Sequence, residues 1–342
     1  MGLAPEEQVR HKQTELGRLF ATLSKSPSDP PWRHVQAGNG LGYRNRIRLR
    51  IASSGEVQFF NPHKTFDCAV LEPSLRMMLP VLREWSQAHG ATLVEFAHLE
   101  VRAADLDGHC GALLTPRDAT RPLSATARGA LSALRSHCLV AVAGEPEMPR
   151  QRYPLTRLVH QSVPLDGFVQ INWAVNARLV DHVVLRAHER RVRTFADLYC
   201  GSGNFALALL AGGLRGVAIE SHRQSIEAAR HAAQTQGLPG GVFEVNQAIS
   251  YAQELQTRGH SYDMAVVDPP RAGVRFGLEA LSALSTGWLV MCSCNPRTLV
   301  RDLIALTGLG WALEEVTTFD MFPQTRHLEV VVWLRKQARD PR

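Results

Sequence analysis

The chain has 342 residues, enough for about two domains, and its 45% of hydrophobic residues is ample for folded cores, which excludes a disordered protein. Its six cysteines are too scattered for a disulfide framework, and no uncharged apolar run approaches the about 18 residues that a membrane-spanning helix needs, so we expect a cytoplasmic protein without a membrane segment. The formal net charge of +6 favours a polyanionic partner, although a base-composition bias of the genome would also produce an excess of arginine over lysine.

The first half of the chain predicts a helix followed by a mixed domain. Residues 11–23 form an amphipathic helix with Leu16, Leu19, Phe20 and Leu23 on its apolar face, and the proline-rich segment at 24–32 ends it. From residue 32 to residue 163, short strands alternate with helical stretches, which indicates an α+β domain. The expected strands lie at 46–51, 56–60, 93–101 and 138–144, and the expected helices at 75–86 and 125–137.

From residue 164 to residue 342, strands and helices alternate regularly. The expected strands begin with 193–200 and end with 287–294, and each is nearly continuous in apolar residues, as strands buried on both faces are. This pattern predicts a doubly wound α/β domain with a parallel sheet. The last two strands, 311–321 and 327–335, have no helix between them, so we expect an antiparallel hairpin that closes one edge of the sheet.

Polar residues and glycines gather where the parallel strands end, which is the edge at which open α/β sheets bind ligands. Gly201 and Gly203 follow the first strand, and Glu220 ends the second, 17 residues after Gly203. A carboxylate at that spacing suits two ribose hydroxyls. The segment lacks the third glycine of a dinucleotide fingerprint, so S-adenosylmethionine is a better ligand than a dinucleotide. Asn246 or Gln247, after the third strand, is placed to meet an adenine edge, and a plain polar loop is the alternative.

The fourth and fifth strands end in residues suited to chemistry. Asp268 precedes two prolines, which fix a carboxylate at a rigid turn, although an ordinary strand-ending turn is the alternative. Cys294 ends the fifth strand and precedes Asn295 and Pro296, a natural N-cap and first helical residue. A thiol at a helix N-terminus lies in a positive field that favours the thiolate. Cys292 lies inside the strand as a small buried residue, and Cys-x-Cys alone lacks the second ligand pair of a metal site.

One strand of the first domain is rich in arginine. In residues 43–51, Arg44, Arg46, Arg48 and Arg50 alternate with Asn45, Ile47, Leu49 and Ile51, so a strand would present four guanidiniums on one face and apolar groups on the other. Such a face attracts phosphates, which predicts contact with RNA. The alternative is an edge strand that charge protects from aggregation.

Five motifs together resemble the RNA 5-methyluridine methyltransferase family, which uses S-adenosylmethionine to methylate uridine in tRNA or ribosomal RNA. They are FVQIN (168–172), DLYCGSGNF (197–205), VVDPPRAG (266–273), CSCNPRTL (292–299) and FDMFPQTRHLE (319–329), with a looser echo at 43–50. The resemblance implies that Cys294 is the nucleophile and Glu329 the general base. It also implies a pocket for cofactor and target lined by Gln170, Tyr199, Asn204, Glu220 and Asp268, with Gln247 as a further cofactor contact.

The resemblance implies three parts in this chain. These are an N-terminal helix and linker at 1–31, an α+β RNA-contacting domain at 32–163 and a Rossmann-like class I methyltransferase domain at 164–342, whose parallel sheet carries the antiparallel edge hairpin. Some family members have an N-terminal oligonucleotide-binding barrel or a four-cysteine iron–sulfur cluster. Because Cys68, Cys110 and Cys138 are scattered here, we expect neither feature, and no metal site.

The motifs leave the RNA target open between ribosomal RNA and tRNA, and a monomer is the default for an enzyme that must admit a large RNA. Two alternatives remain at this point. A methyltransferase directed at nitrogen uses a similar strand-ending turn but does not need Cys294, and an RNA-binding chaperone could retain the cofactor fold without its chemistry. A covalent adduct with RNA would exclude the first, and measured cofactor binding would exclude the second.

Overall fold

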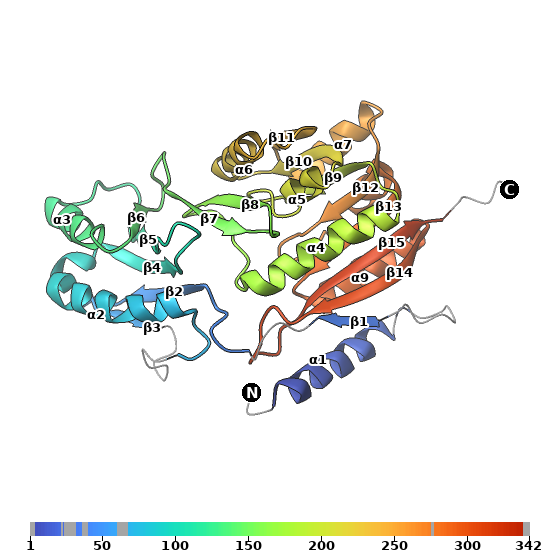
Figure 1. Ribbon diagram of the computed structural model, residues 1–342. Coiled ribbons are helices and arrows are strands. Elements are labelled where there is room, and N and C mark those ends of the chain that lie inside the picture. The colour runs from blue at the N-terminus through green and yellow to red at the C-terminus, as the bar shows by residue number, and fades with distance from the viewer. Residues whose placement is uncertain are drawn as a thin grey trace. The chain divides into compact units, whose positions relative to one another are not determined.

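The computed structural model describes residues 4–21, 23, 32–35, 40–59, 68–274 and 277–337. The chain forms two compact units, drawn together in Figure 1. The larger unit contains residues 1–40, 155–161 and 174–342, and the smaller unit contains residues 41–154 and 162–173. The predicted linker at 24–31 lies outside the described residues. No helix in the described ranges is long and apolar enough to cross a membrane.

A mixed eight-stranded sheet forms the centre of the larger unit, in the order β1-β14-β15-β13-β12-β9-β10-β11. Six strands have the bounds β9 Thr194–Leu198, β10 Arg215–Glu220, β11 Gly241–Val245, β12 Tyr262–Val267, β13 Ser285–Ser293 and β1 Trp32–Val35. The last two are β14 Trp311–Phe319 and β15 Glu329–Lys336. Strands β9 to β13 are mutually parallel, as predicted, and β15 runs antiparallel to both β13 and β14.

The hairpin of β14 and β15 is present, but it does not close the edge of the sheet as expected. Strand β1 pairs in parallel with β14, from Trp32 opposite Val316 to Val35 opposite Phe319, and therefore takes the outer position. This pairing joins segments nearly 300 residues apart in the chain, so no local pattern in residues 32–35 could reveal it.

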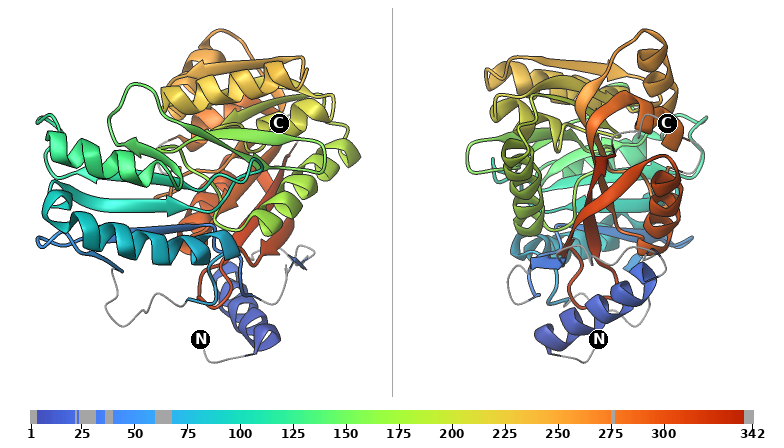
Figure 2. Two further views of the ribbon diagram at one scale, coloured as in Figure 1. Left: turned by 60° about the vertical axis from the view of Figure 1, so that its left-hand side comes forward. Right: turned by 90° about the vertical axis from the view of Figure 1, so that its right-hand side faces the viewer.

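Helices cover both faces of this sheet. The right-hand view of Figure 2 shows the sheet between the two layers of helices. One face packs against α1 Pro5–Phe20, α7 Ala248–Thr257, α8 Leu278–Leu284 and α9 Pro296–Gly308. The other face is covered by α4 Trp173–Glu189, α5 Ala206–Ala211 and α6 Arg223–Thr235. Helix α1 begins six residues before the predicted start because Pro5 suits the first helical position and Glu6 and Glu7 favour the first turn. Its Leu16 and Phe20 are buried.

The smaller unit is a five-stranded sheet with two helices. The strand order is β3-β2-β4-β5-β6, with bounds β2 Arg46–Ile51, β3 Val57–Phe59, β4 Phe96–Arg102, β5 Gly111–Pro116 and β6 Leu139–Val142. Helices α2 Pro73–Leu93 and α3 Ala125–Leu134 pack with the sheet around one apolar core that includes Ile47, Leu49 and Ile51. A two-stranded ribbon, β7 Arg150–Pro154 with β8 His160–Pro164, completes the described strands.

Candidate active site

The carboxyl ends of five parallel strands meet along one edge of the larger sheet. Val267 at the end of β12 pairs with Leu198 of β9 on one side and with Met291 of β13 on the other. The next residue, Asp268, therefore follows its strand beside the ends that carry Tyr199 and Cys292. Glu220 is the last residue of β10, the neighbour of β9 on its other side. Tyr199, Glu220, Asp268 and Cys294 thus belong to adjacent strand ends, as the sequence predicted.

The loop after β9 has an unusual backbone. Tyr199 has φ +67°, and Gly201 and Gly203 have φ +55° and +88°. A positive φ is costly for a tyrosine, and such strain is found mainly where a binding site requires it. A β-carbon added at Gly203 would lie 2.8 Å from Leu207 Cγ, so the turn into α5 has no room for a side chain there.

Glu220 supports this loop from the neighbouring strand. Its Oε2 accepts a hydrogen bond from the Gly201 N–H at 3.3 Å, and its Oε1 accepts bonds from Ser221 Oγ at 2.9 Å and His222 N–H at 3.0 Å. These bonds hold the carboxylate at the strand end.

Asp197 is a residue of this site that the sequence interpretation missed. It is completely buried in β9, its Oδ2 accepts a hydrogen bond from Ala206 N–H at 2.9 Å, and its Oδ1 has no hydrogen-bond partner among the described residues. Burial, with smaller contributions from Asp268 and Glu220, raises the pKa of Asp197 to about 8. The acidic residue that opens DLYCGSGNF, just before the glycine loop, was the available signal.

Glu220 and Asp268 thus place two carboxyl groups at the strand ends, near the buried Asp197, which suits a cationic ligand. S-adenosylmethionine carries a sulfonium and an ammonium group, so the residues present fit this cofactor. Asn204 lies just before α5 and its side-chain amide pairs with that of Asn176 in α4. Asn176 Nδ2 donates to Asn204 Oδ1 at 2.9 Å, and Asn204 Nδ2 donates to Asn176 Oδ1 at 3.3 Å. The exchange fixes both amides at this edge of the sheet.

The two predicted glutamines lie apart from the residues described so far. Gln247 is exposed at the N-cap of α7, and its N–H donates to Asn246 Oδ1 at 2.8 Å, while Asn246 N–H donates to the Glu220 carbonyl at 3.0 Å. Gln170 belongs to the smaller unit, where it is buried and its carbonyl accepts a bond from Asn45 Nδ2 at 2.8 Å.

Cys294 lies just beyond the end of β13, near Glu329 at the start of β15. In the antiparallel pairing of β13 with β15, Cys292 faces Val331 and Ser293 faces Val330, so one further step along both strands brings Cys294 to Glu329. Glu329 is buried, Cys294 is partly buried and Cys292 is only 1% exposed. Asn295 is the N-cap residue and Pro296 the first residue of α9, as expected, but the Asn295 side chain donates to the Arg271 carbonyl at 3.2 Å instead of capping the helix.

Opposing electrostatic effects act on the Cys294 thiol. Burial and the charge of Glu329 raise the pKa of the Cys294 thiol, whereas a hydrogen bond and positive charge from Arg271 lower it. Desolvation and the neighbouring carboxylate therefore disfavour the thiolate of Cys294, and Arg271 favours it. Burial and Asp268 raise the pKa of Glu329 well above its usual range, and Arg271 again opposes the shift.

Burial raises the pKa of both the Cys294 thiol and the Glu329 carboxyl, and the positive charge of Arg271 opposes both shifts. Arg271 acts on both, and sequence reasoning missed it although it directly follows the two prolines of DPPRAG. Burial raises the pKa of Cys292 well above its usual range, which keeps it a thiol.

The arginine strand has the predicted alternation, but its four arginines differ in exposure and in their contacts. Ile47, Leu49 and Ile51 of β2 are buried in the core of the smaller unit, whereas Arg48 and Arg50 are exposed. Arg46 is partly buried, 3.8 Å from a Glu100 carboxylate oxygen and 5.4 Å from the centre of the Phe168 ring. Arg44 precedes the strand, and its Nε donates to the Arg46 carbonyl at 3.1 Å. Arg48 and Arg50 are therefore the better placed of the four for a ligand in solution.

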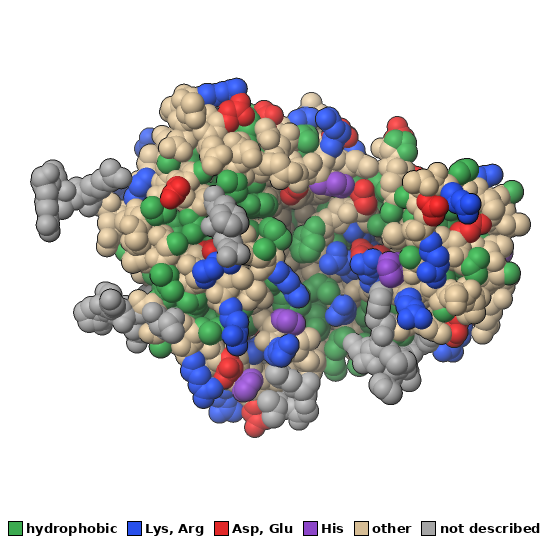
Figure 3. Space-filling view, turned by 180° about the vertical axis from the view of Figure 1, so that it is seen from behind, with side chains coloured by type: hydrophobic (Ala, Val, Ile, Leu, Met, Phe, Trp, Pro, Cys, Tyr) green, Lys and Arg blue, Asp and Glu red, His purple; other side chains and the backbone are tan. Residues whose placement is uncertain are grey.

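Histidine, cysteine and acidic side chains form no group of three that could hold a metal ion within the described part of the chain. In Figure 3, Lys and Arg side chains are spread over the visible face and outnumber Asp and Glu, in keeping with the net charge of +6.

Comparisons with known proteins identify the family of this chain. A family model described as tRNA (Uracil-5-)-methyltransferase matches residues 156–337. A 23S rRNA (uracil(1939)-C(5))-methyltransferase of Vibrio cholerae is 30% identical over 353 residues, covering 97% of this chain and 77% of the relative. The protein of that name from Haemophilus influenzae is 28% identical and covers 95% and 76%.

Among solved structures, the Pyrococcus abyssi tRNA (uracil-54, C5)-methyltransferase in complex with S-adenosyl-L-homocysteine is similar, with a TM-score of 0.73 and 21% identity. The likeness covers 97% of this chain and 84% of that one. It confirms the predicted fold, an α/β methyltransferase domain with a mixed main sheet and a smaller domain rich in strands.

Proposed function

Because the chain belongs to the RNA (uracil-5-)-methyltransferase family and transfers a methyl group from S-adenosylmethionine to carbon 5 of uridine in RNA, we propose that Cys294 is its nucleophile and Glu329 its general base. The observation that carries this assignment is the strand register that leads from Ser293 and Val330 to Cys294 opposite Glu329. The family resemblance of the sequence motifs is confirmed by the same comparisons.

The two residues act at different stages of one reaction. Carbon 5 of uracil is a poor nucleophile, so the Cys294 sulfur first adds to carbon 6 and makes carbon 5 enolate-like. S-adenosylmethionine, when bound, supplies the methyl group as an electrophile. Glu329 then takes the proton from carbon 5, the electron pair re-forms the double bond between carbons 5 and 6, and the Cys294 sulfur leaves. Arg271 stabilises the thiolate at both ends of this cycle.

The cofactor is held by the residues at the strand ends. Glu220 takes the ribose hydroxyls, and the carboxyl groups of Glu220 and Asp268 favour the positive charges of the ligand. Tyr199 and Asn204 line the same pocket from the loop after β9, and Gln247 borders the adenine. The assignment of Gln170 to the pocket is supported by its place in the FVQIN motif.

The RNA-contacting part is the domain that the sequence predicts at 32–163, between the helix and linker at 1–31 and the methyltransferase domain at 164–342. It corresponds to the smaller unit, residues 41–154 and 162–173, without β1, which joins the large sheet. Arg44, Arg46, Arg48 and Arg50 provide its phosphate contacts. Ribosomal RNA is the first candidate substrate, because two relatives that cover at least 95% of this chain carry the name of a 23S rRNA uracil methyltransferase. The scattered cysteines support an enzyme without an iron–sulfur cluster. It acts as a cytoplasmic monomer.

A covalent trap tests the assignment of the nucleophile. Wild-type protein and the Cys292→Ala variant should form a denaturant-resistant adduct with RNA that contains 5-fluorouridine, because that base has no carbon 5 proton to remove. Cys294→Ala should form none and should lose methylation, measured by mass spectrometry of uridine in ribosomal RNA and tRNA. An adduct with folded Cys294→Ala would contradict the proposal.

A further inference from the structure

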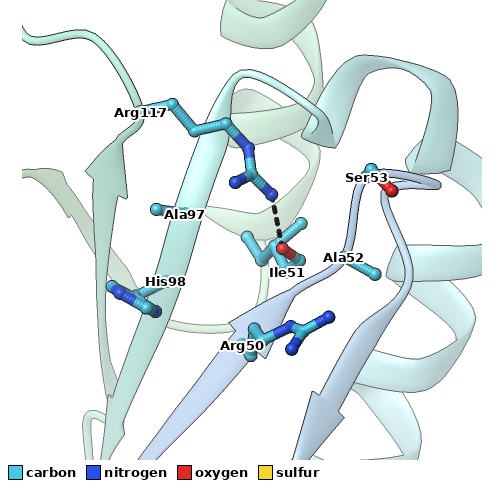
Figure 4. A pocket seen from close by; sticks show the side chains of 7 residues that line it. All are labelled: Arg50, Ile51, Ala52, Ser53, Ala97, His98 and Arg117. Atoms are coloured by element: carbon cyan, nitrogen blue, oxygen red, sulfur yellow. Dashed lines mark hydrogen bonds between the residues drawn. The ribbon is translucent and has the colours of Figure 1, made fainter.

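A cavity of about 320 Å³ lies at the end of the arginine strand in the smaller unit. It is lined by Arg50, Ile51, Ala52, Ser53, Ala97, His98 and Arg117 (Figure 4). This volume is at the lower end of the roughly 300–1,000 Å³ of small-molecule sites. Its lining includes two guanidiniums, an imidazole and a hydroxyl and no carboxylate. The composition suits an anion that accepts several hydrogen bonds.

Three different segments bring the cationic groups together. Arg50 of β2 pairs directly with His98 of β4, and Arg117 follows Pro116, the last residue of β5. The Arg117 guanidinium is fixed in place, since its Nη2 donates to the Ile51 carbonyl at 2.6 Å and its Nε to the Val94 carbonyl at 3.0 Å. Figure 4 shows the first of these bonds. Arginine has five N–H donors, so the remaining ones can serve a ligand without any rearrangement.

No carboxylate among the described residues lines this cavity and neutralises its positive charge. Within the described residues Arg50 makes no hydrogen bond or ion pair, and the same holds for Arg48, two positions earlier on the same side of β2. Burial together with the charges of Arg48 and Arg117 lowers the pKa of His98, so both charged groups acting on it are cations. The nearby acid, Glu100, contacts Arg46 and Arg102 instead.

We propose that this cavity is a subsite for one backbone phosphate of the RNA substrate, bound by Arg50, Arg117 and Ser53. Arg48 lies two residues before Arg50 in β2, about 6.6 Å away along the strand, and continues the row of cations toward the next phosphate. A polymer with regularly spaced negative charge fits such a row better than a free anion does. The proposal rests on the proposed RNA methyltransferase function and adds Arg117 and Ser53 to its RNA contacts.

Salt dependence of RNA binding tests this subsite. With the full-length protein and an RNA that it methylates, Arg50→Ser should weaken binding of all RNA sequences similarly and reduce the slope of log affinity against log salt by about 1. Arg50→Lys keeps the charge and should restore the slope. Arg135→Ser is the matched control, because Arg135 is an exposed arginine of the same unit outside the cavity, and it should keep the wild-type slope.

Each other outcome overturns the subsite. An unchanged slope in folded Arg50→Ser would place this side chain away from RNA, and equal losses in Arg50→Ser and Arg135→Ser would indicate general surface charge. If inorganic phosphate binds the wild type but not Arg50→Ser in calorimetry, while the RNA slope is unchanged, the cavity takes a free anion. Methylation of uridine by the wild type is measured separately, so failure of the proposed function is distinguishable from failure of the subsite.

Discussion

At the scale of single residues, Glu329 gives the sharpest test of the reaction cycle. Glu329→Gln keeps the shape of the side chain but removes the base, so addition and methyl transfer proceed while proton removal stalls. A methylated protein–RNA adduct should accumulate on ordinary uridine, dependent on S-adenosylmethionine and visible on denaturing gels. Its absence in a folded, cofactor-binding variant, or its persistence when Cys294 is also replaced, would show that the roles are divided differently.

Asp197 should make stability depend on pH. Its pKa of about 8, against an ordinary 3.8, means that the folded state holds a proton that the unfolded state releases between those values. The stabilisation is complete below about pH 4 and is lost as the pH rises through 8. Asp197→Asn cannot titrate, so its deficit in urea midpoint relative to wild type should shrink between pH 5 and pH 8. A constant deficit would show that Asp197 is ionised throughout.

The sequence alone identified site residues that lie in short motifs, but it missed residues whose role depends on burial or on long-range contacts. Cys294 was identified as a candidate nucleophile from its neighbours, because Asn295 and Pro296 predict that a helix begins there. The partner of Cys294 is set by the register of β13 with β15, which no pattern near Glu329 encodes, so that residue was assigned through the family motif. Asp197 was missed because an acid inside a strand resembles a solvent-facing residue until burial is known.

At the scale of secondary-structure elements, α1 holds the connection between β14 and β15. Lys12 is buried and donates to Asp320 Oδ1 at 2.6 Å and to the Phe322 carbonyl at 3.1 Å. Gln8, one turn earlier, donates to Gln324 Oε1 at 3.0 Å and accepts from Gln324 N–H at 2.9 Å. Phe319, at the start of this connection, pairs with Glu329 at its end, so α1 helps to position the proposed base.

Lys12→Met should therefore lower both stability and turnover. Removing one partner of a buried ion pair leaves Asp320 uncompensated and costs about 3–5 kcal/mol. We expect a lower urea midpoint and a lower kcat with nearly unchanged KM for S-adenosylmethionine. Arg10→Met, at an exposed position of the same helix, is the control and should change neither. A stable Lys12→Met variant with normal kcat would mean that α1 does not secure the connection.

Most elements of the fold could be predicted from the periodicity of apolar residues, but a few could not. The alternation of apolar strands and helices predicted β9 to β13 in order, and the arginine strand predicted β2 almost to the residue. The strands β5, β7 and β8 and the helix α4 were not predicted, although Val175, Leu179, Val180 and Val183 of α4 have helical spacing. β1 could be placed in the large sheet only through its pairing with β14, which is a long-range contact.

At the scale of the whole molecule, the two units have separate apolar cores, one around β9 to β15 and one around α2, α3 and the five-stranded sheet. S-adenosylhomocysteine should therefore protect them unequally. At a hundredfold excess over Kd a ligand adds about 2.7 kcal/mol to the state that binds it. In hydrogen exchange, slow amides of 194–220 should gain protection, whereas those of 46–59 should not. Equal protection of both segments would show that the units unfold together.

The pairing of β1 with β14 also determines the order in which the protein can assemble as it is made. The smaller unit is complete once residue 173 has been synthesised, because no later residue belongs to it. Helix α1 and strand β1 are made before the smaller unit, yet their partners in α9, β14 and the connection after it come nearly 300 residues later. This segment is thus made before its partners, and Leu16 and Phe20 must stay uncovered until α9 and β14 have been synthesised.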